Sequence, residues 1–179
     1  PEERERARVI LGENGVGAGR PPVAVHPGSG GQGKCWPAPN FARVIAEVEA
    51  AGCQPVMVAG EADNLAVREV LEVPGDGIRI PVLWNLPLRL LGALLAECGV
   101  YLGNDSGVSH LAAAAGAAVT AVFGPTDPAV WAPWGARIIA ADLACRPCGQ
   151  ISAACPHQSL CLRRVGWKEV AAAVLRDAL

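Results

Sequence analysis

Residues 103–135 read GNDSGVSHLAAAAGAAVTAVFGPTDPAVWAPWG, and this stretch decides the fold. The apolar run Val100–Leu102 leads into it and predicts a buried strand. A glycine turn, a small-residue helix over His110–Ala115 and a second apolar strand over Val119–Phe123 follow. A strand, a tight turn, a helix and another strand in this order are typical of a parallel sheet with helices on both faces.

The rest of the chain repeats this alternation. Further strands are predicted at 23–25, 55–59 and 137–140, a short strand or extended piece at 78–83, and helices at 2–11, 41–51, 63–72, 87–98 and 167–178. Asn40 is expected to cap the helix that begins at Phe41. The predicted fold class is therefore α/β, with a doubly wound, Rossmann-like parallel sheet. Ligands of such sheets bind at the carboxyl ends of the strands, which here are followed by 28–34, 60–61, 105–107 and 124–127.

Length and composition describe one globular domain. The 179 residues are 51% hydrophobic and 18% charged, which suits a buried core of Ala, Val and Leu. The net charge of −2, without a basic stripe, argues against a nucleic-acid partner. The most apolar stretch, Leu86–Gly103, contains Arg89 and Glu97, so no transmembrane segment is expected.

The start of the chain predicts an origin in a longer protein. It lacks both an initiator Met and the apolar region of a signal peptide. Residues 1–22 are expected to be a helix and a glycine-rich linker from a preceding domain. Residues 23–179 are expected to form one Rossmann-like domain, with a Cys-rich loop over 142–163 and a C-terminal helix.

Two features at the carboxyl edge of the predicted sheet favour an anion. Asp105-Ser106-Gly107 comes at the start of a helix, where unpaired backbone N–H groups attract a phosphate. Ser106 adds a hydroxyl, and Lys34 ends a glycine loop with a compact positive charge that suits a phosphate oxygen. Because the carboxylate of Asp105 would repel a phosphate, it is expected to cap the helix, to accept hydrogen bonds from sugar hydroxyls, or both.

Two motifs resemble a known family. HPGSGGQGKCWP at 26–37, and GNDSGVSHLAAAAG followed by FGPTDPAVWAPWG, resemble signatures of the bacterial ADP-heptose:lipopolysaccharide heptosyltransferases, glycosyltransferase family 9. The resemblance runs from about Val23 to the C-terminus and covers only the C-terminal of the family's two Rossmann-like domains. It implies the GT-B arrangement, an ADP-heptose donor, a lipopolysaccharide inner-core acceptor, inversion at the anomeric carbon, and no obligatory metal or other cofactor.

The resemblance assigns roles to residues at this edge. Lys34 would stabilise the charge of the departing diphosphate and Asp105 would contact the donor sugar, which makes them the candidate catalytic residues. The candidate donor-binding residues are Ser29, Gly30, Lys34, Glu61, Leu86, Asp105, Ser106, Gly107 and His110. No residue is assigned to a metal.

Several assignments stay open. Glu61 follows a strand at a position where a carboxylate commonly binds ribose hydroxyls, and Asp63 is its rival. Leu86 packs either on adenine or in the core, and His110 either contacts the donor or is structural. A structural role is expected for His26. Plain packing is expected for Trp131 and Trp134, and the alternatives are that they wall the pocket or contact the missing domain.

Residues 28–33, GSGGQG, formally match a dinucleotide fingerprint. That fingerprint requires a helix that opens inside the motif, with its N-terminus facing the pyrophosphate. Here Pro37 and Pro39 follow, and the helix is expected only near Asn40. We therefore expect a phosphate-contacting glycine loop and no NAD site.

Four of the seven cysteines cluster near the C-terminus, at 145, 148, 155 and 161. A CxxC pair with two more thiols nearby is typical of a structural zinc site, although the second pair is wider than in zinc ribbons. Disulfides and free thiols remain alternatives, and a cytosolic setting disfavours lasting disulfides.

Donor binding without turnover is the expected function. The family's catalytic base belongs to the N-terminal domain, so the resemblance implies that this chain binds a nucleotide sugar but does not transfer sugar alone. Acceptor contacts would come from the same domain, and the full enzyme would act in the cytoplasm beside the inner membrane. The alternative is a non-enzymatic sugar- or protein-binding module with a structural Cys site.

Overall fold

Six parallel strands form the centre of the structure, a computed structural model that describes residues 2–17, 19–75, 77–150 and 155–179. The strands lie in the order β3-β2-β1-β4-β5-β6. They are β1 (Pro22–His26), β2 (Gln54–Ala59), β3 (Val82–Trp84), β4 (Val100–Asn104), β5 (Ala118–Val122) and β6 (Arg137–Ile139). The doubly wound α/β fold expected from the sequence is confirmed.

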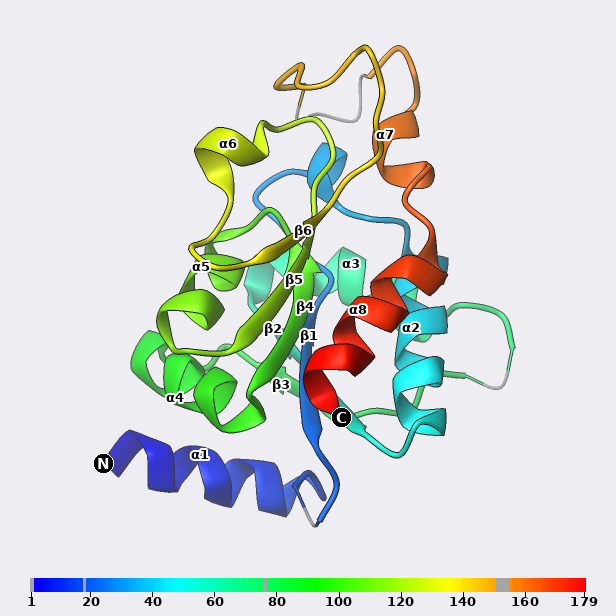
Figure 1. The fold of residues 1–179 in the computed structure, drawn as a ribbon. Helices are drawn as coiled ribbons and strands as arrows, with labels where there is room; N and C mark the ends of the chain where they lie inside the picture. The colour runs from blue at the N-terminus through cyan, green and yellow to red at the C-terminus, as the bar shows by residue number, and fades with distance from the viewer. Residues whose placement is uncertain (1, 18, 76, 151–154) are drawn as a thin grey trace.

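Helices cover both faces of this sheet (Figure 1). One face carries α2 (Ala38–Ala50), α3 (Asn64–Leu71) and α8 (Trp167–Ala178), and the other carries α1 (Glu2–Glu13), α4 (Leu88–Cys98) and α5 (Gly107–Ala114). The shorter elements η1 (Gln32–Lys34), η2 (Glu61–Asp63), α6 (Pro128–Trp131) and α7 (Leu160–Arg163) lie in the loops. Figure 1 shows α6 and α7 at the carboxyl edge of the sheet, at the top of the view.

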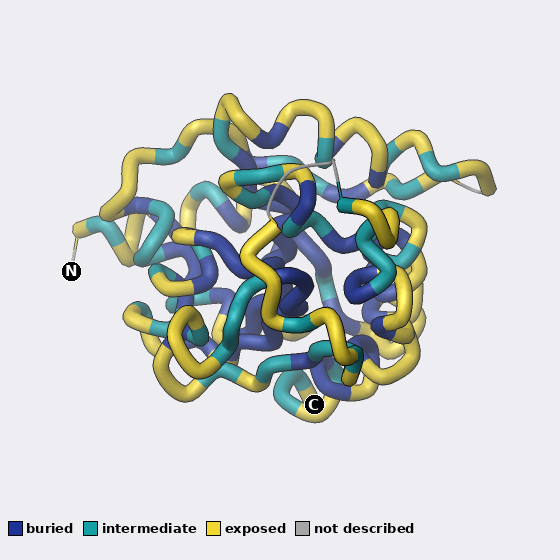
Figure 2. The backbone as a smooth tube through the Cα atoms, turned by 90° about the horizontal axis from the view of Figure 1, so that it is seen from above, coloured by how far each residue is buried: buried dark blue, intermediate teal, exposed yellow. Residues whose placement is uncertain are grey.

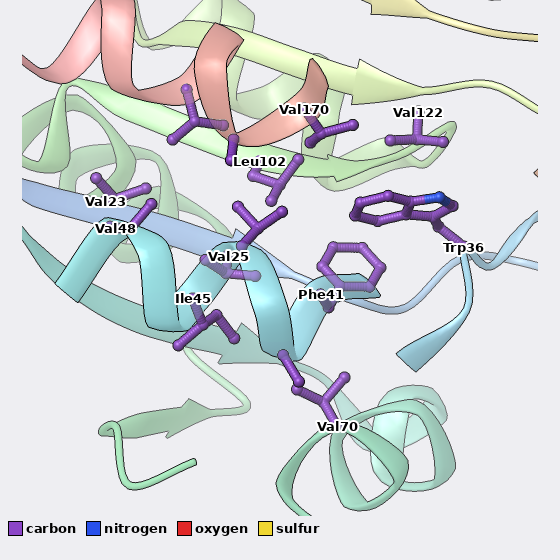
Figure 3. Close-up of a cluster of buried hydrophobic side chains, with 14 of the residues drawn as sticks. Val23, Val25, Trp36, Phe41, Ile45, Val48, Val70, Leu102, Val122 and Val170 are labelled. Atoms are coloured by element: carbon purple, nitrogen blue, oxygen red, sulfur yellow. The ribbon is translucent and has the colours of Figure 1, made fainter. Parts of the chain in front are cut away.

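Alternating strand residues divide the core into two layers. Val23 and Val25 of β1 point to one face, while Ala24 between them points to the other, because successive strand side chains lie on opposite faces. On the first face Trp36 packs edge to face on Phe41, with ring centroids 5.1 Å apart (Figure 3). Figure 2 shows buried stretches of the chain gathered at the centre of the molecule, with exposed stretches around them.

Two predicted boundaries are wrong. The α2 helix begins at Ala38 with Pro37 as its N-cap residue, so Asn40 is not the cap. Proline is tolerated in the first turn of a helix, because the backbone N–H groups of that turn have no partner within the helix. The short strand or extended piece expected over 78–83 contains a strand only from Val82, where β3 (Val82–Trp84) begins, because Pro81 has no N–H to donate to a ladder.

The first helix packs against the body of the domain. Ala7 and Leu11 of α1 are buried against α4, and Arg8 Nε lies 2.7 Å from Glu97 Oε2. The helix that precedes β1 in the sequence is thus part of this fold. None of the helices in the described residues combines the length and apolar character needed to cross a membrane.

Candidate functional site

A cleft of about 370 Å³ opens at the carboxyl edge of the sheet. It lies where β1 and β4 are neighbours, which is the point where the strand order reverses. Ligands of open α/β sheets bind at this switch point, because the connections on either side leave it in opposite directions. Four of the predicted donor-binding residues line it: Ser29, Gly30, Ser106 and Gly107.

The entrance to α5 forms one wall of this cleft. Ser106 is the N-cap residue, and its side chain accepts a hydrogen bond from the backbone N–H of Ser109. The exposed Gly107 follows at the first helical position, where backbone N–H groups lack partners within the helix. The interpretation of Asp105 as the cap is therefore wrong, since the serine one residue later takes that place.

Lys34 lies beside the entrance to α5. Its Nζ is 3.3 Å from Asp105 Oδ2, and both side chains are largely buried. The hydroxyl of Ser29 donates to the carbonyl oxygen of Asp105 over 2.7 Å and ties the glycine loop to the same turn. The cation and the helix entrance are thus close enough for one small anion to contact both.

Asn104 fixes this arrangement, and the sequence analysis gave it no role. Its side chain is fully buried. Its Oδ1 accepts from Trp36 N at 3.0 Å, and its Nδ2 donates to the carbonyl oxygens of Pro27 and Gly28 at 2.8 and 3.1 Å. One amide therefore holds both ends of the glycine loop against β4. An Asn placed at the end of a strand, directly before the acidic turn, was the available signal.

Asp63 is occupied by a buried contact with His26. His26 Nε2 lies 3.0 Å from Asp63 Oδ2, which also accepts from Gly60 N at 2.7 Å. Burial by itself raises the pKa of Asp63, but the hydrogen bonds from His26 and Gly60 outweigh it and leave the pKa below its usual value. A Cβ at Gly28 would come within 1.7 Å of Asp63 Oδ1, so only glycine fits there.

These contacts separate the two rival acids. Asp63 is buried in the His26 contact, whereas Glu61 is exposed at the same edge. Leu86 lines an adjoining hollow of about 130 Å³ together with Gly60 and packs partly against the core. His110 is exposed on α5 and is not among the side chains that line the cleft.

Trp131 and Trp134 do not pack in the described domain. They are 55% and 95% exposed, so the plain packing expected for them is wrong. The pattern that suggested packing was their apolar character alone, which does not say what covers a loop. The glycine loop also differs from a dinucleotide fingerprint, since it leads into the one-turn η1 and not into a long helix.

The described residues of the Cys-rich loop (142–150 and 155–163) lie at the same edge, against Pro125 and Gly33. Cys148 N and Gly149 N both donate to Pro125 O, at 3.0 and 2.9 Å, and Arg146 bonds the carbonyl oxygen of Gly124. All seven cysteines have free thiols, and the four of this loop line one cavity of about 230 Å³. Residues 151–154 of the loop lie outside the described residues, and the others gather no group of three or more metal-ligating side chains close enough to bind an ion.

Comparison with known proteins identifies the family. The family model described as "Glycosyltransferase family 9 (heptosyltransferase)" matches residues 2–159. The chain belongs to glycosyltransferase family 9. Among the family 9 relatives, a lipooligosaccharide heptosyltransferase 2 from Campylobacter jejuni is 30% identical over 145 residues, which are 78% of this chain and 46% of that protein.

Solved structures show the same fold. The Escherichia coli ADP-heptose lipopolysaccharide heptosyltransferase II matches 99% of this chain and 53% of its own, with a TM-score of 0.78 at 23% identity. The Escherichia coli heptosyltransferase WaaC with ADP matches 96% of this chain and 48% of its own, with a TM-score of 0.67 at 18% identity. The chain thus spans about half the length of the family 9 proteins it matches.

Proposed function

We propose that this chain binds the donor of a family 9 heptosyltransferase, ADP-heptose or a related nucleotide sugar, for building the lipopolysaccharide inner core. The observation that carries this proposal is the position of Lys34 beside the amide-rich entrance of α5, whose residues Ser106 and Gly107 line a cleft at the switch point of the sheet. Family membership and a related structure described with ADP agree with it.

The diphosphate would lie between the Lys34 ammonium and the first backbone N–H groups of α5. Charge builds on the diphosphate as the bond to the sugar breaks, and these groups are in place to stabilise it without a metal. In the structure the Lys34 ammonium is paired with Asp105, with Nζ 3.3 Å from Oδ2. Donor binding would draw Lys34 toward phosphate and free the Asp105 carboxylate to accept hydrogen bonds from sugar hydroxyls.

Other parts of the donor would contact neighbouring loops. The exposed Glu61 would accept from ribose hydroxyls, and the hollow beside Leu86 would take the base. His110, exposed on α5, would reach the donor from outside the cleft. The catalytic base and the acceptor site would belong to the remaining half of such an enzyme, acting beside the inner membrane.

A thermal-shift panel tests the proposal. ADP and ADP-glucose should raise the melting temperature, whereas adenosine, UDP-glucose and NAD should raise it less. A specific ligand at 100 times its Kd stabilises a protein by about 2.7 kcal/mol, which such an assay resolves. The chain alone should bind the donor and show no sugar transfer. Failure of every nucleoside diphosphate to stabilise it would favour a non-enzymatic binding module instead.

A further inference from the structure

A chain of buried hydrogen bonds runs behind the proposed phosphate position. Asp63 Oδ2 lies 3.0 Å from His26 Nε2, and His26 Nδ1 lies 3.4 Å from Ser106 Oγ. All three residues are more than nine-tenths buried, and all three line the cleft. They come from η2, the end of β1 and the N-cap of α5, so only the tertiary structure brings them together.

Asp63 decides which nitrogen of His26 carries a proton. Hydrogen bonds from His26 and Gly60 N favour the ionised carboxylate, and an ionised carboxylate can only accept. His26 Nε2 must therefore be protonated. In neutral His26 the other nitrogen, Nδ1, then has a lone pair directed at Ser106.

The hydroxyl of Ser106 has a single proton to share. With neutral His26, Nδ1 can only accept, so the contact exists only if Ser106 donates to it. With doubly protonated His26, Nδ1 donates to Ser106 Oγ, and the serine proton must point elsewhere. Ser109 Oγ lies 3.2 Å away, but the entrance of α5 offers a bound anion as the stronger acceptor.

We propose that His26 is a proton-linked positioning residue, which must gain a second proton before Ser106 can donate its hydroxyl to the donor diphosphate. This inference rests on the proposed donor site. It makes diphosphate binding and protonation of His26 a coupled event, so binding takes up a proton and affinity rises as the pH falls. A histidine changes its charge between about pH 5 and 8, which places the effect in a measurable range.

Other ionisable groups lie near the hydrogen-bond chain Asp63–His26–Ser106, here called the relay. Asp63 from η2 and Tyr101 from β4 face it from the sheet side, and Tyr101, whose pKa is raised by burial, stays neutral in this range. The Lys34–Asp105 ion pair adjoins Ser106 along the chain. The carboxylate of Glu61 is exposed at the same edge.

Calorimetry with ADP-glucose tests the coupling, because its diphosphate carries no group that titrates near neutral pH. Titrations at several pH values, each in two buffers of different ionisation enthalpy, give the protons taken up on binding. The unmodified chain should take up as much as about one proton, with affinity rising at most about tenfold for each unit that the pH falls.

Substitutions at His26 and Ser106 test whether these residues cause the proton uptake on binding. Ser106→Ala should abolish uptake while the backbone amides retain weaker binding, and Ser106→Thr should restore uptake because it keeps the hydroxyl. His26→Gln should bind independently of pH. His157→Gln alters a histidine that lines the separate cavity of the Cys-rich loop, and it should keep the uptake.

The outcomes separate this inference from the donor site itself. Tight binding of ADP-glucose with no proton uptake, or uptake unchanged in Ser106→Ala, overturns the relay and leaves the donor site intact. If His26→Gln fails to fold, the Ser106 pair still decides the question. No binding of ADP-glucose at any pH overturns the donor site, and the relay with it.

Discussion

The turn Asn104–Gly107 and the Cys-rich loop lie at the same edge of one sheet, yet they are held in different ways. The turn is fixed by buried side chains that bond backbone groups, as Asn104 does three times. The described residues of the Cys-rich loop bond the segment after β5 through backbone groups and Arg146, Cys161 and Leu162 pack in the core, and Cys145 and Cys148 are exposed. A binding site that depends on exact atomic positions needs buried side-chain hydrogen bonds such as those of Asn104. The Cys-rich loop, whose cysteines are partly exposed, is held less rigidly.

The largest expected effect is on stability, at the turn. Asn104→Ala leaves Trp36 N and two loop carbonyls buried without partners, and each such group costs about 1–3 kcal/mol. We expect a loss of about 3 kcal/mol or more in urea denaturation. Cys148→Ser, at the same edge, is the matched control and should cost under about 0.5 kcal/mol. Equal losses would show that the two regions are equally fixed.

A smaller effect, on binding, sharpens the role of the turn. Lys34→Ala should weaken ADP binding by about 10- to 100-fold, the value of a charge-assisted hydrogen bond of about 1.5–3 kcal/mol. Adenosine should be affected much less, because it has no phosphate. Lys168→Ala, which removes the chain's other lysine on α8, is the control. An equal loss for ADP and adenosine in calorimetry would refute the phosphate role.

The smallest effect concerns the thiols. Exposed Cys145 and Cys148 should react with a thiol reagent at pH 7.5 within minutes, without loss of ADP binding. Burial raises the pKa of Cys98 to about 12 and that of Cys35 to about 11, so both should react far more slowly until the chain is unfolded. Rapid reaction of Cys98 would contradict the fold. Protection of Cys145 and Cys148 that a chelator removes would indicate a metal in the loop.

Much of the fold followed from local patterns. Apolar runs followed by glycine turns predicted strands at β1, β2, β4 and β5, because burial on both faces of a parallel sheet requires continuous apolar residues. Helix starts were less accurate, as Asn40 shows, since a proline and a polar residue can both stand in a first turn. Exposure of Trp131 and Trp134 could not be read from their apolar side chains.

For the candidate site, too, some features follow from the sequence and others only from the tertiary structure. The sequence by itself determined that a glycine loop ending in Lys34 and a helix entrance at Ser106 follow strands of one parallel sheet, because strand ends of such a sheet share an edge. Only the tertiary structure decided that Asn104 clamps the loop and that Asp63 bonds His26, leaving Glu61 exposed. Those contacts join residues 37 to 77 positions apart, and hydrogen-bond partners at such separations follow from packing and not from local pattern.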